Sequence, residues 1–87
     1  MSSVEVEHHP EQQRFTATVD GQSALLAYVP GDGSVAMTHT LVPRELEGRG
    51  IAGELTRTAV AWAREQGLEI DAQCSYVRHW LSKERGD

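Results

Sequence analysis

The spacing of apolar residues changes at Pro43, and this change limits the folds open to the chain. Before Pro43, apolar and polar residues alternate over short stretches such as Val4-Glu5-Val6, which is the period of a half-buried β-strand. After it, apolar residues recur at the spacing of an amphipathic helix, at Ile51, Leu55, Ala59 and Trp62. The first half is therefore predicted to form strands, and the second half to be organised around a long helix.

Four strands are predicted before Pro43, over residues 4–8, 14–19, 24–29 and 34–42. Asp20-Gly21 is typical of a two-residue hairpin turn, so we expect an antiparallel meander. In the fourth strand, alternation predicts one face with Val35, Met37, His39 and Leu41, and an opposite face with Ala36, Thr38, Thr40 and Val42.

Two helices and one more strand are predicted after Pro43. The long helix covers roughly residues 50–66 and ends before Gly67, where a C-cap glycine is expected. A strand at residues 68–72 leads to a last helix that Ser75 can cap. The apolar stripe of this last helix consists of Val77, Trp80 and Leu81.

The predicted fold class is α+β: a mostly antiparallel five-stranded sheet, one long helix after the fourth strand and a short C-terminal helix. A chain of 87 residues suits one domain, spanning residues 1–87. The net charge of −5 argues against binding to nucleic acid or to an anionic membrane. No segment approaches the roughly 20 apolar residues of a membrane span. The N-terminus lacks the features of a signal peptide and Cys74 is the single cysteine, so we expect a cytoplasmic protein.

Glycines gather where the fourth strand leads into the long helix, in Gly48-Arg49-Gly50-Ile51-Ala52-Gly53. Glycine lets the backbone approach a ligand, and the first N–H groups of a helix attract anions, so this turn suits a pyrophosphate. A tight turn without a ligand is the other interpretation. The spacing also fits the dinucleotide-binding fingerprint, with Asp71 downstream. The hairpins that precede it and the few residues after Asp71 argue against a doubly wound sheet.

The run from His39 to Ala52 resembles the GNAT superfamily of acyl-CoA N-acyltransferases, and in particular its short, stand-alone members. The resemblance continues at Ala63–Leu68 and Cys74–Arg78, so it covers nearly the whole chain. It implies transfer of an acetyl group from acetyl-CoA to a primary amine, on a small molecule or a protein lysine, by direct attack on the thioester. The cofactor-binding residues that it implies are Leu41, Val42 and Pro43 along the pantetheine arm, and Gly48, Arg49, Gly50, Ile51, Ala52 and Gly53 at the pyrophosphate. Glu47 stands where the superfamily usually has Gln or Arg, and we expect it to point away from the phosphates.

Three residues are candidates for the catalytic chemistry. His39 can act as a general base, since an imidazole titrates near pH ~6.5, or it can simply face solvent. Cys74 lies before the last helix, where it can line the site or act as a small buried hydrophobe. Tyr76 can donate a proton to the leaving thiolate, or it is a half-exposed aromatic residue. His8 and His9 face opposite sides of a strand, so we expect no metal site.

Two further functions remain open. The chain could be a catalytically silent CoA-binding module, or a protein-interaction module without a cofactor. Neither the acceptor amine nor the oligomeric state follows from the sequence.

Overall fold

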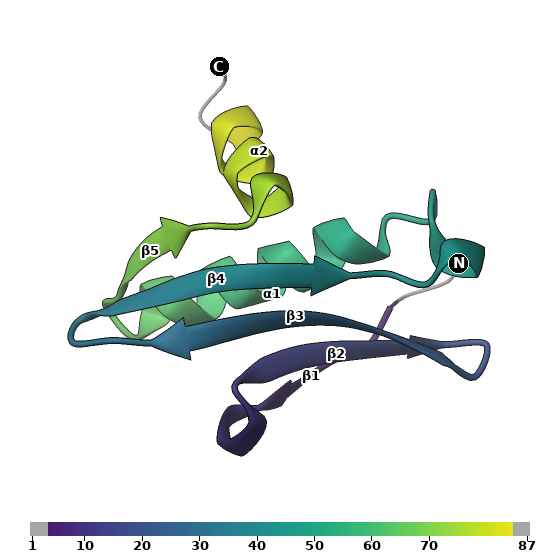
Figure 1. Cartoon of the computed structure of the whole chain (residues 1–87), viewed down its shortest axis with the longest axis horizontal. Coiled ribbons are helices and arrows are strands. Elements are labelled where there is room, and N and C mark those ends of the chain that lie inside the picture. Colours follow the sequence, from purple (N-terminus) through teal and green to yellow (C-terminus); the bar gives the residue numbers. More distant parts are fainter. Residues whose placement is uncertain (1–3, 85–87) are drawn as a thin grey trace.

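The computed structural model describes residues 4–84 of the 87-residue chain. Five strands and two α-helices form one unit, with a three-residue 3-10 helix on either side of the β2–β4 meander (Figure 1). In chain order the elements are β1 (Val6–His9), η1 (Pro10–Gln12), β2 (Arg14–Val19), β3 (Gln22–Pro30), β4 (Ser34–Leu41), η2 (Arg44–Leu46), α1 (Ile51–Glu65), β5 (Glu69–Ala72) and α2 (Ser75–Glu84).

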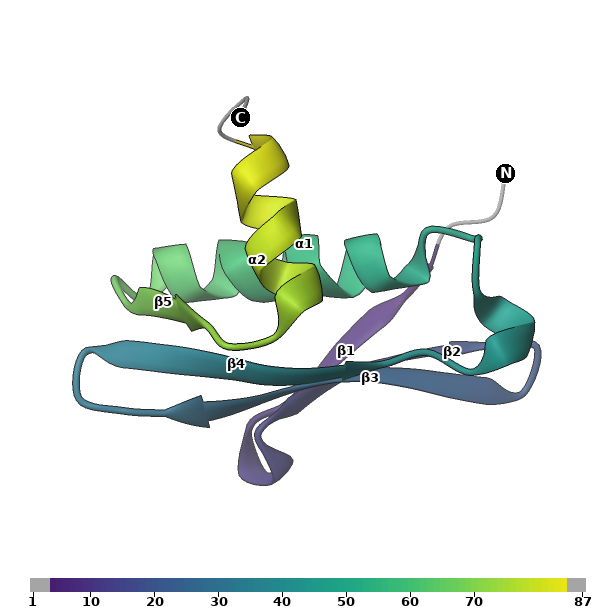
Figure 2. The same cartoon turned by 45° about the horizontal axis from the view of Figure 1, so that its top comes forward.

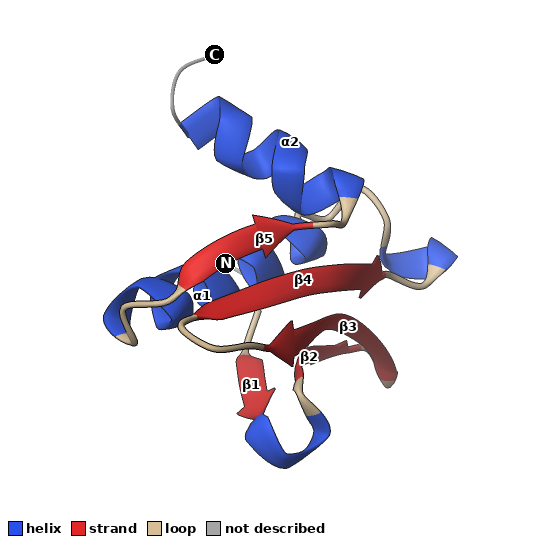
Figure 3. Ribbon diagram, turned by 60° about the vertical axis from the view of Figure 1, so that its left-hand side comes forward, coloured by secondary structure: helices blue, strands red, loops and turns tan. Residues whose placement is uncertain are grey.

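The strands form one mixed sheet in the order β1-β2-β3-β4-β5. The first four strands pair antiparallel, whereas β5 pairs parallel to β4 (Figure 3). The parallel pair forms because α1 carries the chain back to the beginning of β4, where β5 starts. The α+β class, the five strands and the two helices are confirmed; the parallel pair makes the sheet mixed. Both helices lie on the same side of the sheet (Figure 2).

The predicted turns occur where the sequence placed them. Asp20 and Gly21 join β2 to β3 with φ values of 52° and 76°, the two left-handed residues of a type I′ hairpin turn. Gly67 follows α1 with φ 71°, which is the left-handed conformation of a C-cap glycine. Strand ends differ from the prediction by one or two residues, as at β4, which ends at Leu41.

The core lies between α1 and the sheet. One side of α1 is fully buried and packs on inward-facing residues of β2, β3 and β4. The only buried polar side chain among the described residues is Thr56, whose hydroxyl donates to the Ala52 carbonyl at 2.8 Å. The largest buried side chains of this core are Phe15, Leu26, Val35, Met37, Leu46, Ile51, Leu55, Val60 and Val77.

An aromatic cluster closes the core beneath the C-terminal half of α1. Trp62 of α1 packs against Tyr28, with ring centroids 5.0 Å apart. His8 of β1 stacks on Phe15 at 4.1 Å, and its Nε2 lies 2.6 Å from the Tyr28 hydroxyl. The first strand is thus fixed to the sheet by an imidazole that is enclosed by three aromatic rings.

A β-bulge in β4 changes which residues face the helix. Ala27 pairs with His39 but the next residue, Tyr28, pairs with Met37, so Thr38 is an extra residue on β4. Before the bulge, Val35 and Met37 are buried as predicted. After it the alternation is shifted by one residue, because a single inserted residue moves every later side chain to the other face. The prediction that His39 and Leu41 share the face of Met37 is therefore wrong.

The parallel pairing of β4 with β5 is short. It extends from Ser34 to Met37 on β4, and beyond it the N–H groups of Gln73 and Cys74 both donate to the Met37 carbonyl. The remainder of β4, from Thr38 to Leu41, pairs with β3 but not with β5. Within the described part of the chain, one edge of β4 is thus without a strand partner next to the start of α2.

Candidate functional site

The glycine turn connects η2 to α1 and depends on two left-handed residues. Gly48 has φ 83° and Gly50 has φ 77°, a region that residues with a Cβ atom rarely adopt. A Cβ atom added at either position would have no atom within 4 Å, so the conformation, not crowding within the protein, requires glycine. Gly50 is the N-cap residue of α1 and has no side chain to cap the helix, and no side chain within residues 4–84 accepts a hydrogen bond from its first turn. The N–H groups of its first turn therefore remain available to a ligand.

A cavity of about 420 Å³ opens beside this turn, within the range of about 300 to 1,000 Å³ usual for small-molecule sites. Five of the predicted cofactor-binding residues and one predicted catalytic residue border it. Sequence reasoning omitted Leu46 and expected Glu47 to point away, although both also line it. The lining residues are Val42, Leu46, Glu47, Gly48, Gly50, Ile51, Ala52 and Tyr76.

Leu46 and Glu47 each have a recognisable signal in the sequence. Leu46 is the only apolar residue between Pro43 and Gly48, and it is buried at the end of η2, where it anchors the turn to the core. Glu47 occupies the position at which the sequence departs from its superfamily. Glu47 lines the cavity, and a carboxylate close to a bound anion is unfavourable.

Four predicted cofactor-binding residues do not line the cavity. Arg49 reaches back to the β2–β3 hairpin, where its Nη1 donates to Asp20 Oδ2 at 2.9 Å. Leu41 is 52% exposed at the end of β4, and Pro43 precedes η2. Gly53 faces the Tyr76 hydroxyl, which would lie 3.5 Å from a Cβ atom added to the glycine.

The bulge separates His39 from the cavity. His39 is exposed and pairs with Ala27. Ala27 lies on the same face of β3 as the exposed Val29. This face of the sheet lies opposite the one that α1 covers. The imidazole therefore does not border the glycine turn, in contrast to its expected position.

Cys74 lies at the start of α2, next to the unpartnered edge of β4. Its Sγ is 3.4 Å from the Thr40 hydroxyl. Burial alone would raise the pKa of the Cys74 thiol, but hydrogen bonds from the Thr40 hydroxyl and from the backbone N–H groups of Val77, Tyr76 and Thr40 lower it overall. The thiol is thus partly buried and held where β4 and β5 diverge.

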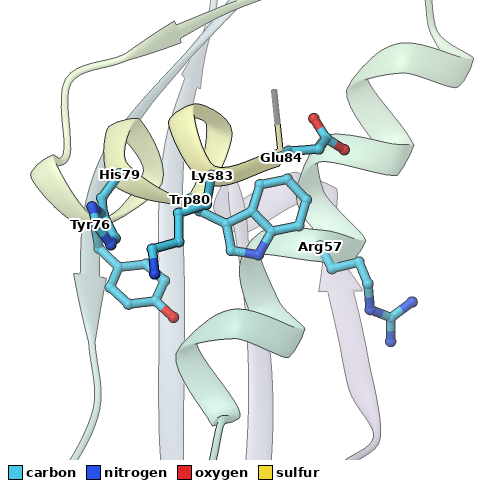
Figure 4. A pocket seen from close by; sticks show the side chains of 6 residues that line it. All are labelled: Arg57, Tyr76, His79, Trp80, Lys83 and Glu84. Carbon is cyan, nitrogen blue, oxygen red and sulfur yellow. The ribbon is translucent and has the colours of Figure 1, made fainter. Parts of the chain in front are cut away.

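Tyr76 connects this cavity to a second depression. Its side chain is 38% exposed, and it borders both the cavity at the glycine turn and a groove of about 710 Å³ between α1 and α2 (Figure 4). Its ring and hydroxyl therefore lie at the entrance to the first turn of α1. Of the three predicted catalytic residues, the structure brings Tyr76 to the cavity and Cys74 to the adjacent strand edge.

Two kinds of feature are missing from residues 4–84. No group of three or more His, Cys, Asp or Glu side chains is placed to bind a metal ion. Neither α1 nor α2 has the length and apolar composition of a membrane-spanning helix.

Comparison with known proteins agrees with this architecture. The family described as GCN5-related N-acetyl-transferase matches residues 14–86. Protein NATD1 of Xenopus tropicalis is 31% identical over 85 residues, covering 94% of this chain and 78% of the relative. Protein NATD1 of Homo sapiens is 30% identical over 83 residues, covering 92% and 74%.

A solved structure shows the same fold. The NMR solution structure of a GCN5-like protein from Staphylococcus aureus superimposes with a TM-score of 0.73 at 32% sequence identity, covering 99% of this chain and 85% of that one. The family match spans the glycine turn, the unpartnered edge of β4 and Tyr76. The chain belongs to the GCN5-related N-acetyltransferase family.

Proposed function

We propose that this protein transfers an acetyl group from acetyl-CoA to a primary amine, on a small molecule or on a protein lysine. The observation that carries the proposal is the N-terminus of α1, whose N-cap residue is a glycine without a capping side chain and which opens through Gly48 and Gly50 onto a cavity. Unpaired N–H groups and the positive end of the helix dipole bind phosphate oxygens.

The residues around the cavity fit CoA in two respects. The backbone at Gly48, Gly50, Ile51 and Ala52 provides N–H groups for the pyrophosphate. The edge of β4 that β5 leaves unpaired has main-chain donors and acceptors for an extended, amide-containing chain such as pantetheine. Leu41, Val42 and Pro43 lie at the end of that edge, so they remain our proposed contacts for this arm. Arg49 can join the phosphate site by leaving its exposed ion pair with Asp20, which stabilises the turn little.

In the proposed reaction, the thioester supplies an activated acetyl group. The amine nitrogen attacks the carbonyl carbon, an amide bond forms, and the carbon–sulfur bond breaks. We assign to Tyr76 the proton that the departing thiolate needs, because its hydroxyl lies at the cavity. Cys74 lines the point where β4 and β5 diverge. The amine loses its proton to solvent, since His39 is on the exposed face.

The acidic balance of the chain favours a cationic acceptor. A net charge of −5 attracts polyamines and lysine side chains over long distances. We also propose that the protein binds neither nucleic acid nor a membrane and that it is located in the cytoplasm.

The position of His39 also supports a second candidate function. Because His39, the predicted base, lies on the face of the sheet opposite α1, the protein could bind CoA without catalysing transfer. Such a silent module would keep the glycine turn and lack turnover with any amine.

The test combines turnover with matched variants of two glycines. Wild type is incubated with acetyl-CoA and a panel of polyamines and lysine peptides, and acetylated amine is measured by mass spectrometry. Gly50→Glu should abolish product formation. Gly33→Glu is the control, since Gly33 has a similar φ of 73° with equal space around it, in the β3–β4 turn.

The outcomes separate the candidate functions. Turnover by wild type and Gly33→Glu, but not by Gly50→Glu, supports the enzyme. Binding of acetyl-CoA without product from any amine supports the silent module. If wild type neither binds acetyl-CoA nor acetylates any amine, both candidate functions are refuted.

A further inference from the structure

Neither α1 nor α2 covers the second face of the sheet, which we call the open face (Figure 2). The large apolar side chains that are exposed within residues 4–84 are Val29, Leu41 and Tyr76, and the first two lie on this face. In the pairing of β3 with β4, Leu25 lies beside Leu41 and Val29 lies beside Ala36. These four residues form an apolar strip along β3 and β4.

The charges on the two sides of the apolar strip differ in sign. On β2, Arg14 pairs with Ala27 and so faces the same way as the strip. Arg14 forms no ion pair within residues 4–84, and its Nε is buried there without a hydrogen-bond partner. On β5, the exposed Asp71 pairs with Ala36, and Glu69 is exposed on the same face. An unpaired cation thus lies on one side of the strip and two carboxylates lie on the other.

Two polar contacts on this face leave that pattern intact. The carboxylate of Glu7, on β1, lies 3.6 Å from Nε2 of its neighbour His9. Oδ2 of Asp71 accepts a hydrogen bond from the amide of Gln73 at 3.0 Å. An amide carries no net charge, so the charge of Asp71 is still available to a cation.

The open face is complementary to a second copy of itself. A two-fold axis that is parallel to the strands and lies between β3 and β4 turns this face onto that of a second copy. Each β3 then faces β4 of the other copy, so the two apolar strips pack together as in a β-sandwich. Each β2 faces β5 of the other copy, which brings Arg14 toward Asp71 twice by symmetry. A carboxylate is the partner that the guanidinium of Arg14 lacks within its own chain.

We propose that the open face is the interface of a homodimer, in which Arg14 of each copy pairs with Asp71 of the other. The apolar strips supply the hydrophobic contact, and the two ion pairs fix how the copies are oriented. The strip is short, so we expect a weak dimer with a Kd of roughly 10 to 100 µM. Because α1 and α2 lie on the other side of the sheet, the proposal does not depend on a bound cofactor.

Analytical ultracentrifugation of wild type over a concentration series that spans this range tests the dimer. The mass should rise from monomer to dimer. Val29→Glu places a charge on the strip and should be monomeric throughout, since a buried charge without a partner is unfavourable. Ala61→Glu is the matched control, because Ala61 is exposed on α1, and this variant should dimerise as wild type does.

Charge reversal tests the orientation of the two copies. Arg14→Glu and Asp71→Arg should each be monomeric, because like charges would meet at both ion pairs. The two variants together should form a heterodimer, because both contacts again join opposite charges. Arg14→Glu with a fluorescent label at its N-terminus should bind Asp71→Arg at least about tenfold more tightly than it binds Glu65→Arg. Glu65→Arg is a matched control with the same net charge, and Glu65 is exposed on α1.

Circular dichroism shows whether each variant is folded. If Arg14→Glu is unfolded, Val29→Glu and Asp71→Arg test the interface by themselves. A wild type that stays monomeric throughout the series would overturn the proposal, as would a dimer that Val29→Glu and Asp71→Arg leave intact. All these measurements are made without acetyl-CoA, so their failure would not bear on the proposed function.

Discussion

The third glycine of the turn provides a prediction that separates structure from ligand binding. Gly53 lies within α1, and its φ is not in the left-handed region, unlike those of Gly48 and Gly50. A Cβ atom added there would meet only the Tyr76 hydroxyl, at the ordinary contact distance of 3.5 Å. Gly53→Ala should therefore stabilise the protein by about 0.5 to 1 kcal/mol, because alanine loses less conformational entropy in a helix than glycine does. For a domain of 60–100 residues, 1 kcal/mol corresponds to roughly 4–8 °C in Tm.

Thermal unfolding followed by circular dichroism measures the change in Tm, and calorimetric titration with acetyl-CoA measures the change in Kd. We expect a higher Tm and an unchanged Kd for Gly53→Ala. Gly48→Ala should lower Tm instead, since a left-handed alanine costs about 1 kcal/mol or more. A lower Tm for Gly53→Ala would show that the turn is packed differently, and a weaker Kd at a higher Tm would show that the ligand itself needs the space at Gly53.

Three more predictions concern charge and proton transfer. Glu47→Gln should strengthen acetyl-CoA binding by a few-fold at low salt, since a carboxylate within about 7 Å of a pyrophosphate costs roughly 1 kcal/mol. Calorimetry that shows no higher affinity for acetyl-CoA than in the control variant Glu45→Gln would contradict this. Burial, followed by the charge of neighbouring His9, lowers the pKa of His8 below its usual 6.5. The stability that neutral His8 provides is therefore present above about pH 6.5 and is lost as pH falls through the lowered pKa. Urea titrations from pH 7.5 to 5 should show this decline, and an equal decline in His8→Gln would exclude His8 as its cause. Tyr76→Phe should lower kcat by about a hundredfold or more with Kd for acetyl-CoA unchanged, whereas equal turnover by the two proteins would remove Tyr76 as the proton donor.

Features that depend on neighbouring residues could be predicted from the sequence. The type I′ turn needs two left-handed residues, which Asp20-Gly21 supplies. The limits of α1 follow from its apolar spacing and from Gly50 and Gly67 on either side. The form of the glycine turn could be predicted because the requirement for positive φ and the position before a helix both lie in a few adjacent residues.

The bulge at Thr38 could not be predicted, because it is a property of the pairing between two strands. Regular alternation through β4 places His39 on the same face as Met37, and only the register against Ala27 and Tyr28 reveals the extra residue. The consequence for the site is large: His39 moves to the exposed face, and Thr40 instead reaches Cys74. The positions of Glu47 at the cavity and of Trp80 in the groove likewise depend on how α1 and α2 lie relative to η2 and to each other.

The central claim is that acetyl-CoA binds at the glycine turn, and calorimetric titration of three proteins tests it directly. Wild type and Gly33→Glu should bind acetyl-CoA equally. Gly50→Glu should bind at least about a hundredfold more weakly, a loss of roughly 2.7 kcal/mol, because its carboxylate would stand at the proposed pyrophosphate site. Circular dichroism should show that both variants are folded with a similar loss of Tm, since both place glutamate at a left-handed position. Undiminished binding by Gly50→Glu would place the cofactor elsewhere, and no binding by wild type would contradict the account as a whole.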